Sequence, residues 1–116
     1  MALFHMRMAD GSTVETTCRR IRAEIDGQPF WFAVHEVQGR VAKTISHFAS
    51  GIRVCDLPYE AAFAMHARRD ERVIALEALA HLAKQVGPDR MRQKLSEAER
   101  KYSPDALAHP VQQPQG

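Results

Sequence analysis

The dipeptide Asp26-Gly27 separates two stretches of β-forming residues, Thr17–Ile25 and Gln28–Val37. Asp-Gly is the strongest short signal for a β-hairpin, because a type I′ turn needs positive φ at both central positions. A two-residue loop also fixes the strand register as three facing pairs: Ala23–Phe30, Ile21–Phe32 and Arg22–Trp31. The first two pairs make an apolar face, so the turn chemistry and the hydrophobic pattern predict the same hairpin.

Further turns extend this hairpin into a meander of four to five strands, expected within residues 2–56. Asp10-Gly11 can join Ala2–Met8 to a strand that begins near Ser12. Two weaker turns, each with a four-residue loop, are expected at Gln38-Gly39 and Ala49-Ser50-Gly51. They would align Phe32, Ile45 and Val54 across three strands. The facing pairs would then be Lys43–Asp56, His35–Ala42 and His47–Ile52. Because polar Glu15 and Thr17 share the parity of Ile21 and Ile25, we expect a bulge or a break near Cys18–Arg20.

Pro58 marks a change from strands to helices, which are expected over residues 58–102. Asp70 can cap a helix whose apolar stripe is Val73, Leu76, Leu79, Ala80, Ala83 and Val86. Gly87-Pro88 ends that helix, and Asp89 can cap the next, which carries a narrow stripe of Met91, Leu95, Ala98 and Tyr102. That stripe can dock on the domain or pair with the same helix of a second copy in a homodimer.

The expected fold class is therefore α+β, an antiparallel meander sheet with C-terminal helices packed on one face. Residues 1–102 form a single domain, and the Pro/Gln-rich segment 103–116 is expected to be disordered. The predicted core is Phe4, Ile21, Ile25, Phe30, Phe32, Ile45, Val54, Phe63, Leu76, Leu79 and Leu82. The start of the chain is too short and polar for a signal peptide, and no run is long enough to span a membrane, so a cytoplasmic protein is expected.

The sequence contains no recognisable catalytic motif, and we expect neither an enzyme nor a cofactor. His35 and His47 lie on neighbouring predicted strands but do not converge, so no metal site is expected, and both are assigned to the less buried sheet face. Cys18 and Cys55 have no implied partner base and are expected to be buried and inert.

Two groups of residues are candidates for binding. Tryptophan and arginine are the residues most enriched in interface hot spots, which makes a partner-binding surface of Trp31, Arg22, Arg20 and Arg53 the first candidate. The last helix offers the alternative, a nucleic-acid contact through Arg90, Arg92, Lys94, Arg100 and Lys101. The formal net charge of only +2 argues against a dedicated nucleic-acid-binding domain.

Residues 28–86 resemble small orphan proteins of bacteriophage and prophage accessory regions. The resemblance rests on Trp31, Val34-His35, Thr44-Ile45-Ser46-His47, Ser50-Gly51-Ile52-Arg53-Val54 and the alanine-rich helix that follows. It implies a non-enzymatic binding protein that blocks a bacterial defence protein, or a protein–nucleic acid complex, by surface occlusion, as anti-CRISPR inhibitors do in the host cytoplasm. Many anti-CRISPRs are strongly acidic, whereas this chain is near neutral, so charge mimicry of DNA is not expected.

Overall fold

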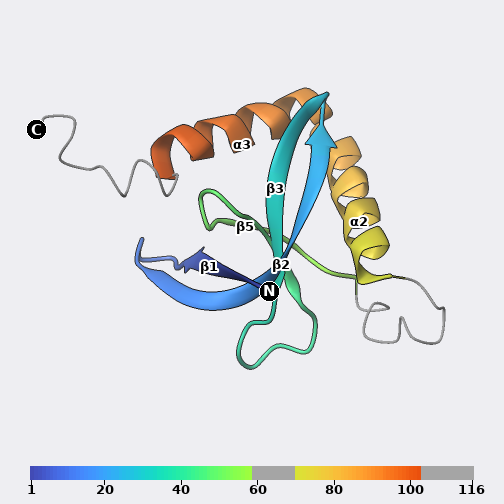
Figure 1. Cartoon of the computed structure of the whole chain (residues 1–116). Coiled ribbons are helices and arrows are strands. Elements are labelled where there is room, and N and C mark those ends of the chain that lie inside the picture. The colour runs from blue at the N-terminus through green and yellow to red at the C-terminus, as the bar shows by residue number, and fades with distance from the viewer. Residues whose placement is uncertain (59–69, 103–116) are drawn as a thin grey trace, which may run out of the picture.

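The computed structural model describes residues 1–58 and 70–102, which form an antiparallel five-stranded meander followed by two helices (Figure 1). Neighbouring strands pair in the order β1-β2-β3-β4-β5. The expected α+β fold is confirmed. The predicted core residue Phe63 and the predicted disorder of 103–116 lie outside the described residues. The elements are β1 Ala2–Arg7, β2 Thr13–Ile25, β3 Gln28–His35, β4 Thr44–His47, β5 Arg53–Asp56, α2 Glu71–Val86 and α3 Pro88–Tyr102.

The β2–β3 hairpin has the register expected from Asp26-Gly27. Ile21 pairs with Phe32, Arg22 with Trp31 and Ala23 with Phe30. Asp26 and Gly27 both have positive φ, 53° and 79°, as a type I′ turn requires. The turn geometry and the pattern of buried residues therefore both fit the strand register that the sequence predicted.

Strand β2 runs without interruption through Cys18–Arg20, so the prediction of a bulge or a break there is wrong. Its N-terminal half pairs with β1 and its C-terminal half with β3. The helices contact β2 and bury Ile21 and Ile25, whereas Glu15, which shares their parity, remains exposed. We infer that Glu15 lies on the same face but beyond the part that the helices cover.

The registers of β4 and β5 differ from the prediction. The β3–β4 loop spans residues 36–43 instead of four residues, so Phe32 pairs with His47, and His35 pairs with Thr44 in place of Ala42. The β4–β5 turn is as expected, with the amide of His47 donating to the carbonyl of Ile52. An irregularity between Ile45 and Ser46 then shifts the pairing by one residue.

Two predicted alignments fail because of these shifts. Ile45 lies opposite Val34 on one side and Cys55 on the other, so it does not line up with Phe32 and Val54. Asp56 lies opposite Thr44, and Lys43 is instead free to reach the start of α2.

The sheet buries side chains on both faces. The face that meets the helices carries the larger core, with Phe30, Phe32, Ile45 and Leu79 among its members and Val54, Leu76 and Leu82 packed at its margin. The opposite face, here called the outer face, carries a small second cluster of Phe4, Cys18 and Ala33, against which Phe48 packs. Strand β1 contributes Phe4 to this cluster, and its Ala2 and Met6 pack around it, where the curl of the sheet brings β1 over this face.

The curl brings β1 against the turn between β4 and β5. The amide of Arg7 donates to the carbonyl of Gly51 at 2.9 Å, and the Arg7 guanidinium donates to the carbonyl of Ser50 at 3.0 Å. Gly51 has φ of +78°, and a Cβ at this position would lie 2.2 Å from the carbonyl oxygen of His5. Only glycine therefore allows β1 to approach this closely.

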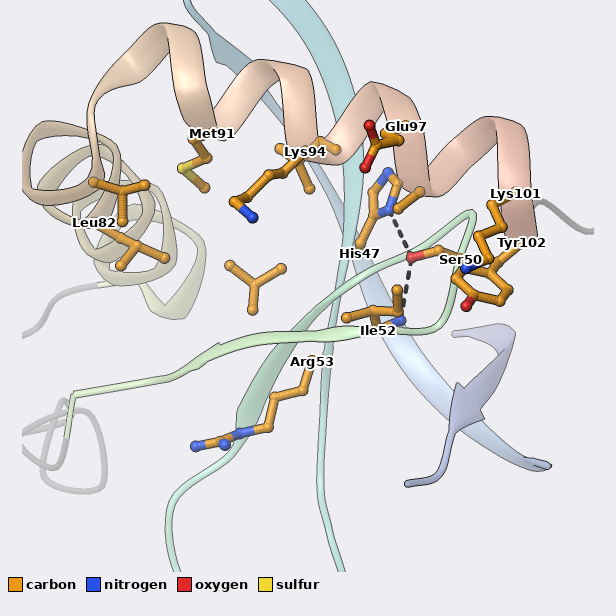
Figure 2. A pocket seen from close by; sticks show the side chains of 14 residues that line it. His47, Ser50, Ile52, Arg53, Leu82, Met91, Lys94, Glu97, Lys101 and Tyr102 are labelled. Atoms are coloured by element: carbon orange, nitrogen blue, oxygen red, sulfur yellow. Dashed lines mark hydrogen bonds between the residues drawn. The ribbon is translucent and has the colours of Figure 1, made fainter. Parts of the chain in front are cut away.

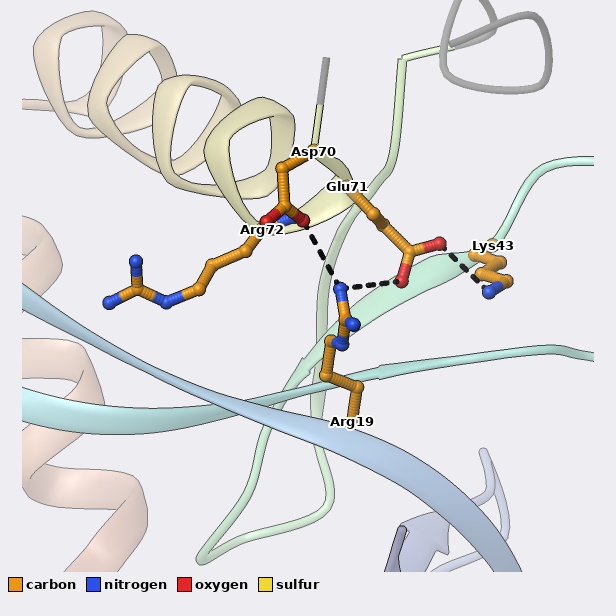
Figure 3. Close-up of polar contacts among 5 residues, drawn as sticks. All are labelled: Arg19, Lys43, Asp70, Glu71 and Arg72. Atoms are coloured by element: carbon orange, nitrogen blue, oxygen red, sulfur yellow. Dashed lines mark hydrogen bonds and ion pairs between the residues drawn. The ribbon is translucent and has the colours of Figure 1, made fainter. Parts of the chain in front are cut away.

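Helix α2 begins where expected, because the carboxylate of Asp70 accepts from the amide of Arg72 at 2.9 Å. Its buried residues are Ile74, Ala75, Leu79 and Ala83, whereas Val73, Ala80 and Val86 are exposed. The predicted stripe was thus rotated on the helix, since α2 carries apolar residues on more than one side. Figure 3 shows how ion pairs connect the start of α2 to the sheet: Arg19 to Asp70 and Glu71, and Lys43 to Glu71 at 2.8 Å.

Helix α3 starts at Pro88, so Asp89 lies inside its first turn and is not the expected cap. Asp89 instead accepts from the side chains of Arg92 and Gln93. Met91 and Leu95 are buried in the larger core. The first half of the predicted stripe therefore docks on the core of its own chain, and pairing of α3 with the same helix of a second copy stays a prediction.

Candidate functional site

The outer face of the β2–β3 hairpin presents an exposed tryptophan. Trp31 is 43% exposed, and the guanidinium carbon of Arg20 lies 4.4 Å from the centroid of its ring. The same guanidinium lies 5.3 Å from the centroid of the Phe48 ring. Arg20 therefore makes cation–π contacts with two aromatic rings, which hold it in a defined position.

The neighbouring residues extend this surface. Arg22 is the cross-strand partner of Trp31 and is exposed, and the amide of Phe48 donates to the carbonyl of Trp31 at 3.0 Å. We call the set of Arg20, Arg22, Trp31 and Phe48 the Trp31 face. The structure thus brings together three of the four residues predicted from sequence and adds Phe48, which the sequence analysis missed because it follows β4 outside the hairpin.

The fourth predicted residue, Arg53, lies apart from the Trp31 face. It is on β5, which β4 separates from β3, and its guanidinium pairs with Asp56 at 3.1 Å. The alternative basic residues lie along α3. Among them, Arg92 is half-buried and is bound by Asp26 and Asp89. The other four are exposed, and Lys101 lies over the Tyr102 ring.

The two strand histidines are buried, contrary to the expectation that they lie on the less buried face. His35 is 2% exposed, contacts the Ser46 hydroxyl at 2.8 Å and has its ring centroid 4.8 Å from that of Phe4, with the two rings tilted by 41°. His47 is 1% exposed on the helix-facing side. Both side chains find hydrogen-bond partners, which makes their burial tolerable. Burial lowers the pKa of each imidazole.

His47 connects the β4–β5 turn to α3. Its Nε2 lies 3.1 Å from a carboxylate oxygen of Glu99, and its Nδ1 lies 2.7 Å from the hydroxyl of Ser50. Because a carboxylate only accepts, Nε2 carries the proton, and Nδ1 accepts from Ser50. Glu99 raises the pKa of His47 and so opposes part of the effect of burial.

Serine, histidine and glutamate in this order resemble the connectivity of an acyl-transfer triad. The Ser50 hydroxyl, however, is 2% exposed and also accepts from the amide of Ile52. The amide of Gly51 donates to the His47 carbonyl, so neither amide is available to stabilise an oxyanion. The geometry fits a structural role. The hydrogen bonds from Ser50 through His47 to Glu99, here called the brace, connect the β4–β5 turn to α3. Sequence could not reveal it, because His47 and Glu99 are 52 positions apart.

Beside this brace lies a groove of about 450 Å³ between β4–β5 and the two helices (Figure 2). Its apolar lining comes from Ile52, Val54, Leu82, Val86, Met91, Leu95 and Ala98. Lys94 extends from α3 toward the middle of the groove, whereas the Arg53 side chain points away from it. The sequence signal for this groove was the narrow stripe on α3, which forms one of its walls.

The two cysteines, Cys18 and Cys55, have no activating environment. Burial raises the pKa of Cys55 to about 11 and also raises the pKa of Cys18, so both thiols stay protonated at neutral pH.

Within residues 1–58 and 70–102, no three His, Cys, Asp or Glu side chains gather as a metal site would require. In the same part of the chain, no helix has the length and apolar character needed to cross a membrane.

The chain matches no protein-family model, no curated protein and no solved structure. The resemblance to phage accessory proteins therefore remains a prediction, and the function has to be inferred from the geometry of the described residues.

Proposed function

We propose that this protein acts by binding a partner macromolecule through the Trp31 face, without catalysis. The observation that carries the proposal is the exposure of Trp31 beneath the guanidinium of Arg20, on the sheet face opposite the helices. Tryptophan and arginine are enriched among the few residues that contribute most of the binding energy at protein interfaces. Arg20 is already held by two rings, so little side-chain entropy is lost when a partner binds.

The chemistry of the Trp31 face defines a partner surface. Two exposed guanidinium groups favour carboxylates, and the Trp31 ring favours an apolar contact between them. A bacterial host protein with an acidic surface around an apolar residue would fit. The phage-like pattern extends the proposal to occlusion of a host defence protein in the host cytoplasm, with anti-CRISPR inhibitors as the analogy.

A quantitative pull-down from bacterial lysate tests the Trp31 face. The double variant Trp31→Ala/Arg22→Ala should lose the partners that the wild-type chain captures, while its unfolding transition stays close to that of wild type. The matched control is Val73→Ala/Arg72→Ala, which also removes an apolar side chain 43% exposed and an exposed arginine, but on α2. Equal capture by both folded variants would contradict the proposal.

The non-catalytic part of the proposal has its own test, because Ser50 has the partners of a catalytic serine. An organophosphonate reagent that modifies activated serines should leave the intact mass of the protein unchanged, since the hydroxyl is buried and engaged in hydrogen bonds. An adduct on Ser50 that disappears in Glu99→Gln would instead indicate an enzyme.

Nucleic-acid binding by α3 is the second candidate, favoured by the exposure of Arg90, Lys94 and Arg100 along one helix. Phosphate contacts make affinity fall steeply with salt, by a log–log slope of about 0.9 for each phosphate neutralised on duplex DNA. A titration of a labelled duplex at low and moderate salt tests this candidate. Absence of binding at low salt would eliminate it.

A further inference from the structure

The groove between β4–β5 and the helices has the dimensions of a small-molecule site. Its volume of about 450 Å³ lies within the range of roughly 300–1,000 Å³ found for ligand pockets. The α3 wall extends from Met91 to Tyr102, about 16 Å at a rise of 1.5 Å per residue. A groove of this length suits an elongated ligand.

The lining of the groove is apolar except for a few charged residues. Leu82 and Val86 come from α2, Leu95 and Ala98 from α3, and Val54 from β5. Val86, which is part of this apolar lining, is 40% exposed to solvent. Contact with a hydrocarbon chain would remove this surface from water, which stabilises binding by about 25 cal/mol per Å² of apolar area.

The charged residues of the groove differ in their contacts. Arg53 pairs with Asp56 and points away. Glu97 also lines the groove, and its carboxylate interacts electrostatically with the Lys101 ammonium, which lies over the Tyr102 ring. Among the residues that the structure describes, Lys94 has no ion-pair or hydrogen-bond partner, and its ammonium extends into the groove (Figure 2). An unpaired cation above an apolar floor complements an anion that carries an apolar tail.

We propose that this groove binds a single-chain amphipathic anion, a carboxylate on an unbranched hydrocarbon tail, with the carboxylate held by Lys94. A twelve-carbon tail is about 14 Å long when its carbon–carbon bonds of about 1.5 Å are staggered. Its length is close to that of the α3 wall, and with the carboxylate at Lys94 the tail would contact the apolar side chains that α2 and β5 contribute to the groove. This site lies on the helix-facing side of the sheet, so the inference does not depend on the role of the Trp31 face.

Calorimetric titration with dodecanoate, kept below its micelle concentration, tests the site, with dodecylammonium as the opposite-charge probe. Wild-type protein should bind one dodecanoate per chain saturably and should bind dodecylammonium at least tenfold more weakly. Lys94→Gln should weaken dodecanoate binding by about tenfold or more, because a hydrogen bond to a charged group contributes about 1.5 kcal/mol or more. Arg90→Gln, an exposed charge one turn earlier on α3, is the matched control and should bind as wild type does.

A second variant separates the apolar contribution from the charge. Ala98→Trp places a large ring in the groove and should abolish binding of dodecanoate while the unfolding transition is retained. If this variant does not fold, methyl chemical shifts of Leu82 and Val86 in the wild-type protein give the same information, because they should move on addition of dodecanoate. The inference is overturned by absence of saturable binding, by equal affinity for the two probes, or by an unchanged affinity in Lys94→Gln.

Discussion

The imidazole of His47 on β4 lies 3.1 Å from the carboxylate of Glu99 on α3. This contact connects the central part of the sheet to the last helix, and the Ser50 hydroxyl extends it into the β4–β5 turn. Every polar atom of the imidazole is thereby used in a position that is almost fully buried. The arrangement predicts measurable effects on stability.

Replacement of Ser50 by alanine should destabilise the fold. The substitution leaves His47 Nδ1 and the amide of Ile52 without their partner, and an unsatisfied buried polar group costs about 1–3 kcal/mol. Urea unfolding checks this value. Ser12→Ala is the control, because the Ser12 hydroxyl also bonds a neighbouring side chain but is exposed, so its loss should change the free energy of unfolding by less than about 0.5 kcal/mol. Equal changes in the free energy of unfolding for the two substitutions would show that the Ser50 contacts of the brace do not stabilise the fold.

The buried histidines predict that stability falls on acidification. Burial lowers the pKa of His35 and of His47, so the unfolded chain binds protons that the folded chain does not. The free energy of unfolding should therefore decrease as the pH falls below the unfolded histidine pKa of about 6.5, by up to about 1.4 kcal/mol per pH unit for each group, until the folded pKa is passed. Urea unfolding between pH 7.5 and pH 5 measures this slope.

Substitution of Glu99 tests whether His47 contributes to the pH dependence of the free energy of unfolding. Because its carboxylate raises the pKa of His47, Glu99→Gln should lower that pKa further and extend the loss of stability to lower pH. His47→Gln should remove the contribution of this histidine and leave that of His35. A wild-type stability that is flat between pH 7.5 and pH 5 would show that neither imidazole is held in its neutral form.

The parts of this fold that sequence predicted are those set by local chemistry. Asp26-Gly27 fixes the β2–β3 register because both turn residues adopt positive φ. Asp70 caps α2, as its side chain and position indicated. The register of β4 was missed because the β3–β4 connection spans eight residues, 36–43, and no short turn fixes its pairing.

The candidate site was only partly predictable for the same reason. The alternation of residues around a defined turn placed Arg22 beside Trp31. Phe48 and Glu99 join their neighbours only through tertiary contacts, which no local pattern encodes. Histidine is a polar residue, so its burial in the strands follows from the partners that the fold supplies.

Gly51→Ala tests whether β1 is held by the β4–β5 turn. A Cβ at this position would lie 2.2 Å from the His5 carbonyl oxygen, and the positive φ disfavours any L side chain. Backbone strain costs about 1–3 kcal/mol, and displacement of β1 adds about 1–3 kcal/mol more. Gly39→Ala is the matched control, because Gly39 has a similar φ of +85° with open space around it, and it should show the backbone strain alone.

Amide hydrogen exchange should also become faster at Arg7 in Gly51→Ala, since the hydrogen bond from the Arg7 amide to the Gly51 carbonyl is lost. Equal destabilisation by the two substitutions, with Arg7 still protected, would mean that β1 does not depend on this contact.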